Sequence, residues 1–149
     1  MPIAVRRYSC TALLLLALGA AACGKDTPTT PTATTTTQTA AEPTNSVDFN
    51  GTVPVTGSTF YSFSVSQYGT VNLTLTSVGG AVVPTTVTLG MGLGVPDGTD
   101  CVTSTTVNTR SGTTAQLTAI FNPGVYCAKV YDVGNLFGPA SVSVTIAYP

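Results

Sequence analysis

Apolar and polar residues alternate with a period of two through most of the chain after residue 46. The segment 61–66 alternates aromatic or aliphatic residues with serine, and 141–148 alternates apolar residues with serine and threonine. Further alternating segments are 71–76, 87–91, 117–121 and 126–130. Successive side chains of a β-strand point to opposite faces, so the pattern predicts strands that bury one face. No segment after residue 46 carries the apolar stripe of a helix.

Turn-forming sequences separate the alternating segments. Examples are "VTGS", "VPDG" and "NPG", in which glycine, proline or aspartate provides the backbone conformations of tight turns. Seven or eight short strands within the 104 residues of 46–149 predict an all-β domain. An antiparallel β-sandwich is the architecture that this spacing of strands and turns favours.

The first 22 residues have the features of an export signal. Arg6 and Arg7 precede the apolar run "ALLLLALGAAA", which occupies 12–22. As a helix this run would extend roughly 16 Å, about half the hydrocarbon core of a bilayer. Its length therefore favours a signal peptide over 1–22. The alternative is an uncleaved membrane anchor formed by 8–22.

A cysteine, Cys23, ends the apolar run. The sequence "GAAAC" resembles the lipobox of bacterial lipoproteins, although Ala20 stands where that motif prefers leucine. The resemblance implies that Cys23 is diacylated, becomes the mature N-terminus and anchors the protein in a membrane. Gly24 follows, with no aspartate directly after the cysteine, which resembles lipoproteins sent to the outer membrane rather than the inner one. Ordinary cleavage after Ala22 is the alternative, and it would release a soluble secreted domain.

A threonine- and proline-rich segment comes next. Residues 27–44 include 10 threonines and 3 prolines among 18 residues. Such a segment offers no large apolar side chains for a core, so folding would not compensate for the lost conformational entropy. We therefore expect 23–45 to be a lipidated cysteine followed by a flexible, extended linker that holds the domain away from the membrane.

The three remaining cysteines fall into two groups, one in the signal and two in the domain. Cys10 lies in the signal, which leaves Cys101 and Cys127 as the pair within the domain. In an exported chain this pair predicts a disulfide, which would stabilise the domain by roughly 3.5 kcal/mol in the chain-entropy model. Two reduced buried thiols are the alternative. Because the chain has no histidine, we expect no zinc site.

Three motifs carry a family resemblance. They are "DFNGTV" (48–53), "STFYSFSVSQYGTVNLTLT" (58–76) and "LTAIFNPGVYCAKVYDVG" (117–134). Together they resemble the bacterial pre-peptidase C-terminal domain, a jelly-roll-like β-sandwich that is often appended to secreted proteases. The resemblance implies this fold and a non-catalytic role. The chain departs from the family at 84–94, where "PTTVTLGMGLG" replaces an acidic D-x-D-L strand.

Composition excludes several classes of function. Without histidine, Ser-His-Asp and Cys-His catalytic arrangements are impossible. The charged fraction is 7% and the net charge −1, which gives nucleic acid no basic surface to bind. A serine–lysine pair would have to use Lys129, which alternates with apolar neighbours and should point outward, with Asp132 as a candidate partner. We therefore predict a protein that is not an enzyme and has no cofactor.

The turn sequence "VPDGTDC" contains Asp97 and Asp100. Their carboxylates, with backbone carbonyls of the same loop, are candidate ligands for calcium. Aspartate is also a common turn former, and we expect that role here.

Loops at the ends of a sandwich are the usual places for recognition. The candidate binding residues are Tyr68, Arg110, Leu136 and Phe137. Tyr68 is suited either to packing over its turn or to stacking on a ligand. Leu136 and Phe137 would mark a protein contact if exposed, but we expect both to close the end of the core. Two functions stay open, a tethered envelope module that contacts protein or glycan, and a structural surface-coat protein without a specific ligand.

Overall fold

The computed structural model describes residues 38–149, so the predicted signal peptide and Cys23 lie outside the described residues. Within this range no helix is long and apolar enough to cross a membrane. The chain instead forms strands, whose bounds are β1 (Asn45–Val53), β2 (Ser58–Val65), β3 (Gly69–Gly79), β4 (Leu89–Asp97), β5 (Asp100–Thr109), β6 (Leu117–Phe121), β7 (Gly124–Tyr131) and β8 (Ala140–Tyr148).

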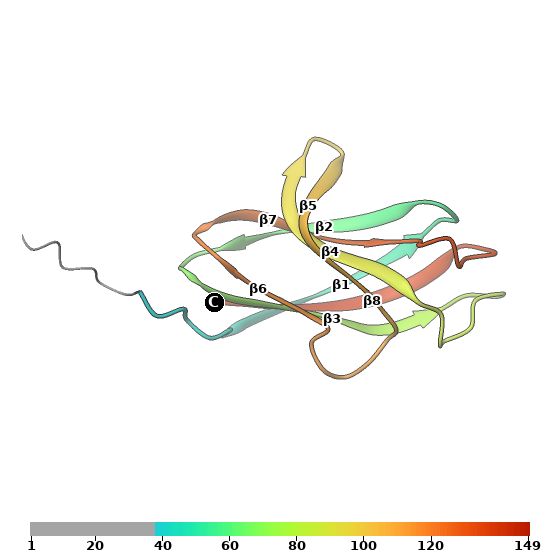
Figure 1. The fold of residues 1–149 in the computed structure, drawn as a ribbon, viewed down its shortest axis with the longest axis horizontal. Coiled ribbons are helices and arrows are strands. Elements are labelled where there is room, and N and C mark those ends of the chain that lie inside the picture. The colour runs from blue at the N-terminus through green and yellow to red at the C-terminus, as the bar shows by residue number, and fades with distance from the viewer. Residues whose placement is uncertain (1–37) are drawn as a thin grey trace, which may run out of the picture. The chain divides into compact units, whose positions relative to one another are not determined.

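The strands form two four-stranded antiparallel sheets (Figure 1). One sheet has the order β1-β8-β3-β6, and the other has the order β2-β7-β4-β5. Each strand of the first half pairs with its counterpart in the second half: β1 with β8, β2 with β7, β3 with β6, and β4 with β5. A sandwich in which the first strand pairs with the last, the second with the second-last and so on has the jelly-roll topology. The predicted all-β, jelly-roll-like sandwich is therefore confirmed.

The core between the sheets is apolar. Leu73 and Leu75 on β3, Met91 on β4 and Ile146 on β8 are each 0% exposed. No polar or charged side chain is buried in the described part of the chain. The core residues come from the alternating segments, because a period of two turns every second side chain toward the opposing sheet.

The chain joins the sandwich at the end where the C-terminus also lies, which we term the linker end (Figure 1). The amide of Ala41 donates to the carbonyl of Tyr68 at 3.1 Å, and the carbonyl of Ala41 accepts from the amide of Thr70 at 2.8 Å. These bonds form a short parallel bridge between Ala41 and Gly69. The last residues assigned to the linker are thus held against the domain. The β1–β2, β3–β4 and β7–β8 connections gather at the opposite end, the loop end.

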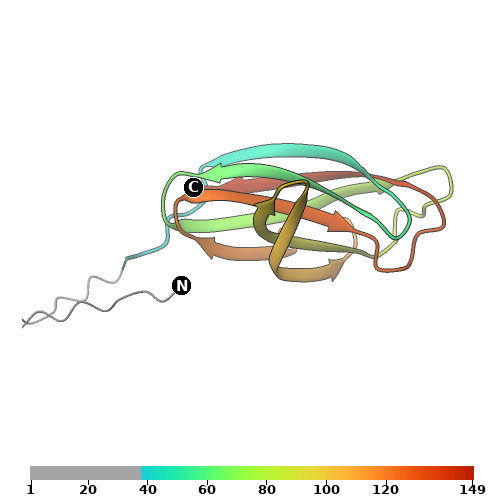
Figure 2. The same cartoon turned by 90° about the horizontal axis from the view of Figure 1, so that it is seen from above.

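The β4–β5 hairpin leaves the outline of the sandwich. β4 pairs with β7 only from Gly90 to Gly94, and the register of β4 with β5 shifts between Leu93 and Gly94. A bulge of this kind bends a strand and increases its twist. Beyond it the hairpin turns across the outer face of its own sheet, as Figures 1 and 2 show from two directions.

Candidate functional site

Three alternating glycines allow the hairpin to lie on the outer face of the sheet. On β4, Leu89, Met91 and Leu93 point into the core, and each is followed by a glycine on the outer side, Gly90, Gly92 and Gly94. A Cβ on Gly92 would overlap the side chain of Thr103, and one on Gly94 would overlap the backbone of β5. Glycine within a strand is typical of such close approaches. The glycines therefore allow the bent part of β5 to approach the outward side of β4 closely.

A disulfide fixes the hairpin in this position. Cys101 on β5 and Cys127 on β7 are joined with an S–S distance of 2.04 Å and a Cα–Cα distance of 5.9 Å. Both residues are buried, at 2% and 0% exposure, although Cys127 lies on the outer face of the sheet. The hairpin itself provides the cover. The predicted disulfide is present.

An ion pair reinforces the same contact. The ammonium of Lys129 on β7 lies 2.7 Å from Oδ1 of Asp100, which also accepts the amide of Cys101 at 2.7 Å. The hydrogen bond from Lys129, followed by the one from the Cys101 amide, lowers the pKa of Asp100 below its ordinary value of 3.8. Lys129 points outward as expected. Its partner is Asp100 rather than Asp132, because the folded-back hairpin brings Asp100 over β7.

The two calcium candidates flank the tip of the hairpin. Asp97 and Asp100 are register partners at the ends of β4 and β5, and Gly98 between them has a φ of +59°. The carboxylate of Asp100 is already engaged by Lys129. Within residues 38–149, no group of three or more His, Cys, Asp or Glu side chains is placed to hold a metal ion.

Asp132 joins two connections at the loop end. Its Oδ1 accepts the amides of residues 134, 135 and 136 at 2.8–3.2 Å, and its Oδ2 accepts the amide of Thr56 at 2.9 Å. Burial raises the pKa of Asp132, but these four amides together outweigh burial and the net pKa is lowered. Thr56 has a φ of +58°, which is unusual for a residue with a Cβ. The bond to Asp132 helps to hold the β1–β2 turn in this conformation.

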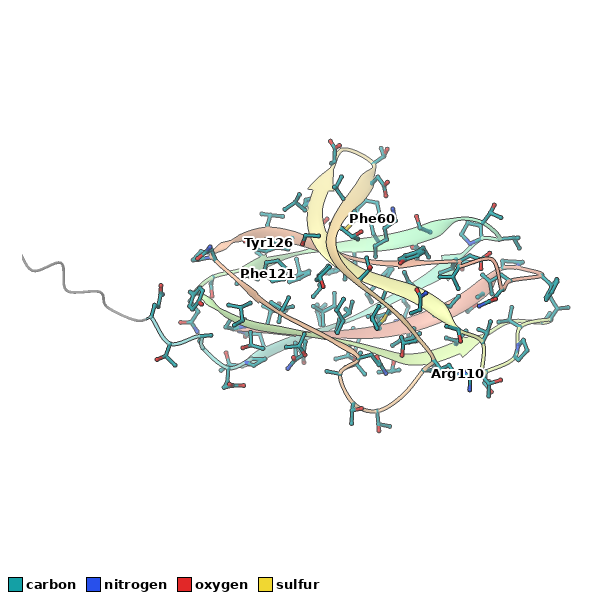
Figure 3. All side chains as sticks on the ribbon, in the orientation of Figure 1. Phe60, Arg110, Phe121 and Tyr126 are labelled. Atoms are coloured by element: carbon teal, nitrogen blue, oxygen red, sulfur yellow. A yellow bond between two sulfur atoms is a disulfide. The ribbon has the colours of Figure 1, made fainter. Side chains whose placement is uncertain are left out.

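A hollow of about 320 Å³ lies between the hairpin, the β1–β2 turn and the end of β7. We term it the hairpin pocket, and its lining residues are Thr56, Gly57, Ser58, Thr103, Lys129, Tyr131 and Asp132. The ring of Tyr131 lies over Gly90, where any side chain would overlap it. Phe60 is the register partner of Lys129, and Figure 3 shows it beside the hairpin. The outer face of the β2-β7-β4-β5 sheet is therefore concave beside the hairpin.

The candidate binding residues do not come together. Tyr68 is half-buried at the linker end, where its carbonyl receives the Ala41 amide. Arg110 follows β5 and lies apart from the aromatic pair Phe121 and Tyr126, whose ring centroids are 4.2 Å apart (Figure 3). No single site contains the residues that the sequence singled out.

The two adjacent apolar residues of the β7–β8 loop have opposite environments. Leu136 is 5% exposed and closes the core as expected, whereas Phe137 is 91% exposed, so the expectation is wrong for Phe137. The turn around Asp132 is the physical reason, because it binds the amide of Leu136 and directs that side chain inward. Phe137, the next residue, projects from the loop end.

Sequence reasoning missed Tyr131 as a site residue and treated Lys129 as a solvated strand residue. The useful signal was the alternation of glycine with apolar residues at 89–94, which in a strand indicates that another part of the chain approaches closely. No protein-family model matches this chain, and no curated protein matches it either.

Proposed function

We propose that this protein is a non-catalytic lipoprotein of the bacterial cell envelope, anchored through Cys23, whose β-sandwich contacts another envelope component. The observation that carries the proposal is the Cys101–Cys127 disulfide. A buried disulfide fits an oxidising compartment outside the cytosol, which is where the N-terminal sequence pattern would send the chain.

Three of the five carboxylates among residues 38–149 have structural partners, which supports a non-catalytic domain. Asp48 accepts the hydroxyl of Thr145 at 2.7 Å, Asp100 binds Lys129, and Asp132 binds four backbone amides. Each of these groups has a structural partner, and a general acid or base must instead be free to exchange a proton with a substrate. The resemblance to pre-peptidase C-terminal domains agrees with this role, since its three motifs supply β1, β2, β3, β6 and β7.

The geometry of the sandwich suits a tethered module. The chain joins at the linker end, and the loop end with the exposed Phe137 lies at the opposite end (Figure 1). A domain held by its linker would therefore present the loop end away from the membrane. We favour the outer membrane, from the Gly24 context of the cysteine.

Mass spectrometry of the mature protein tests the anchor. We expect residues 1–22 to be absent and the Cys23 peptide to carry the mass of a diacylglyceryl group. A Cys23→Ser variant should lose the lipid and leave the membrane fraction, whereas the matched Cys10→Ser variant should behave as wild type. Recovery of an unlipidated protein, with the signal uncleaved or cleaved elsewhere, would overturn the anchor.

A further inference from the structure

We propose that the hairpin pocket binds a neutral saccharide, stacked on Tyr131 and hydrogen-bonded by Ser58, Thr103 and Lys129. The inference rests on the proposed function in one respect, that the domain contacts an envelope component. It does not depend on the lipid at Cys23. The pocket, of about 320 Å³, falls at the lower end of the ligand-site range of about 300–1,000 Å³. This volume suits one or two sugar rings.

Tyr131 provides the platform. Its ring is held over Gly90 because glycine leaves just enough room for it, and the ring also lines the pocket. A sugar ring has an apolar face of C–H groups that packs against an aromatic ring. Because Gly90 and the strand already restrict Tyr131, little side-chain freedom is lost when a ligand binds.

The polar groups of the pocket are those that a polyol requires. Among the residues that the structure describes, the hydroxyls of Ser58, Thr103 and Tyr131 make no hydrogen bond to protein. Each can donate and accept, as sugar hydroxyls do. Lys129 gives one hydrogen to Asp100 and retains two further donors. The pocket therefore offers unused donors and acceptors beside an apolar ring.

Charge selects a neutral ligand over an anion. Lys129 is the one cation that lines the pocket, and Asp100 neutralises it at 2.7 Å. Asp132 adds a second carboxylate to the lining. The local charge is thus negative, so phosphate or an acidic sugar would be repelled. Asp132 is saturated by four amides and serves to position the β1–β2 turn.

The test is a titration of the ¹⁵N-labelled full chain, solubilised in a detergent without a sugar head group. The probes are glucose, galactose, mannose, N-acetylglucosamine and the disaccharides maltose, lactose and diacetylchitobiose, with glucuronate and inorganic phosphate as anionic probes. We expect at least one neutral probe to saturate with a Kd of about 0.1–10 mM, and to shift the amide signals of Gly57, Ser58 and Thr103. The anionic probes should bind more weakly.

Variants assign the binding to the pocket. Tyr131→Leu should weaken binding at least tenfold, and Ser58→Ala, a small change on the surface, should weaken it about threefold without affecting folding. Phe137→Leu is the matched control, because it removes an exposed aromatic ring outside the pocket, and it should bind as wild type.

Three results would overturn the saccharide site: no neutral probe binding at 20 mM, tighter binding of the anions, or signal shifts confined to residues outside the pocket. Failure of all neutral probes with a lipidated Cys23 would remove this inference and leave the anchor standing. Saccharide binding by a protein without lipid at Cys23 would overturn the anchor and leave the saccharide site standing.

Discussion

Reduction of the Cys101–Cys127 disulfide should destabilise the domain without unfolding it at room temperature. The cross-link joins residues 26 positions apart, and a closed loop of that length restricts the unfolded chain by about 3.5 kcal/mol. The entropy of unfolding is about 2.1 cal/mol/K per residue, so for residues 38–149 the expected loss in Tm is about 15 °C. The core does not depend on the cross-link, because β4 still pairs with β7 from Gly90 to Gly94.

The assay compares thermal and urea unfolding of the oxidised and reduced full chain by circular dichroism. The reduced wild type is the sharpest comparison, since it retains both sulfur atoms and loses only the covalent bond. A Cys101→Ala/Cys127→Ala double variant should lose somewhat more, because it also removes two buried side chains. Hydrogen exchange should increase most at residues 95–103 in the reduced protein. A stability change below about 1 kcal/mol, or exchange spread evenly over both sheets, would refute the reasoning from loop closure.

Three further predictions concern the loop end and the glycines. Asp132→Asn should lower the stability of the domain near pH 7. Because the pKa of Asp132 is lowered, its stabilising contribution is present above pH 3.8 and is lost as the pH falls below that value. The difference in unfolding free energy between variant and wild type should therefore narrow in acid, which unfolding measured as a function of pH would show. Gly94→Ala should destabilise the domain by about 2 kcal/mol or more because its Cβ would overlap β5, whereas the control Gly79→Ala, whose Cβ meets nothing within 4 Å, should change the urea midpoint little. Leu136→Ala should lower the free energy of unfolding by about 2–5 kcal/mol, whereas Phe137→Ala should leave it almost unchanged, because Leu136 is buried and Phe137 is exposed. Equal effects in the same unfolding assay would contradict the orientation of this loop.

The sequence pattern was sufficient to predict the strands but not the folded-back position of the β4–β5 hairpin. Alternation over residues 61–66 or 141–148 is a local signal, and it is set by which face of one strand meets the core. The folded-back position of the β4–β5 hairpin over β7 depends instead on the register shift between Leu93 and Gly94 and on contacts between strands distant in the chain. The alternation in β7 correctly predicted that Lys129 points outward. It could not give Asp100 as the partner, because the folded-back hairpin creates that contact.

The disulfide and the glycines point to what the hairpin contributes. Glycine in a strand interior costs about 0.5–1 kcal/mol relative to alanine, so Gly90, Gly92 and Gly94 together cost about 1.5–3 kcal/mol. The disulfide, at about 3.5 kcal/mol, offsets this and little more. Folding the hairpin back is thus possible without a net cost from its glycines. Its main consequence is a concave wall beside Lys129 and Tyr131, on a face that an ordinary sandwich would leave flat and solvated. The saccharide site proposed above includes this wall, so the test of that site is also a test of what the hairpin does.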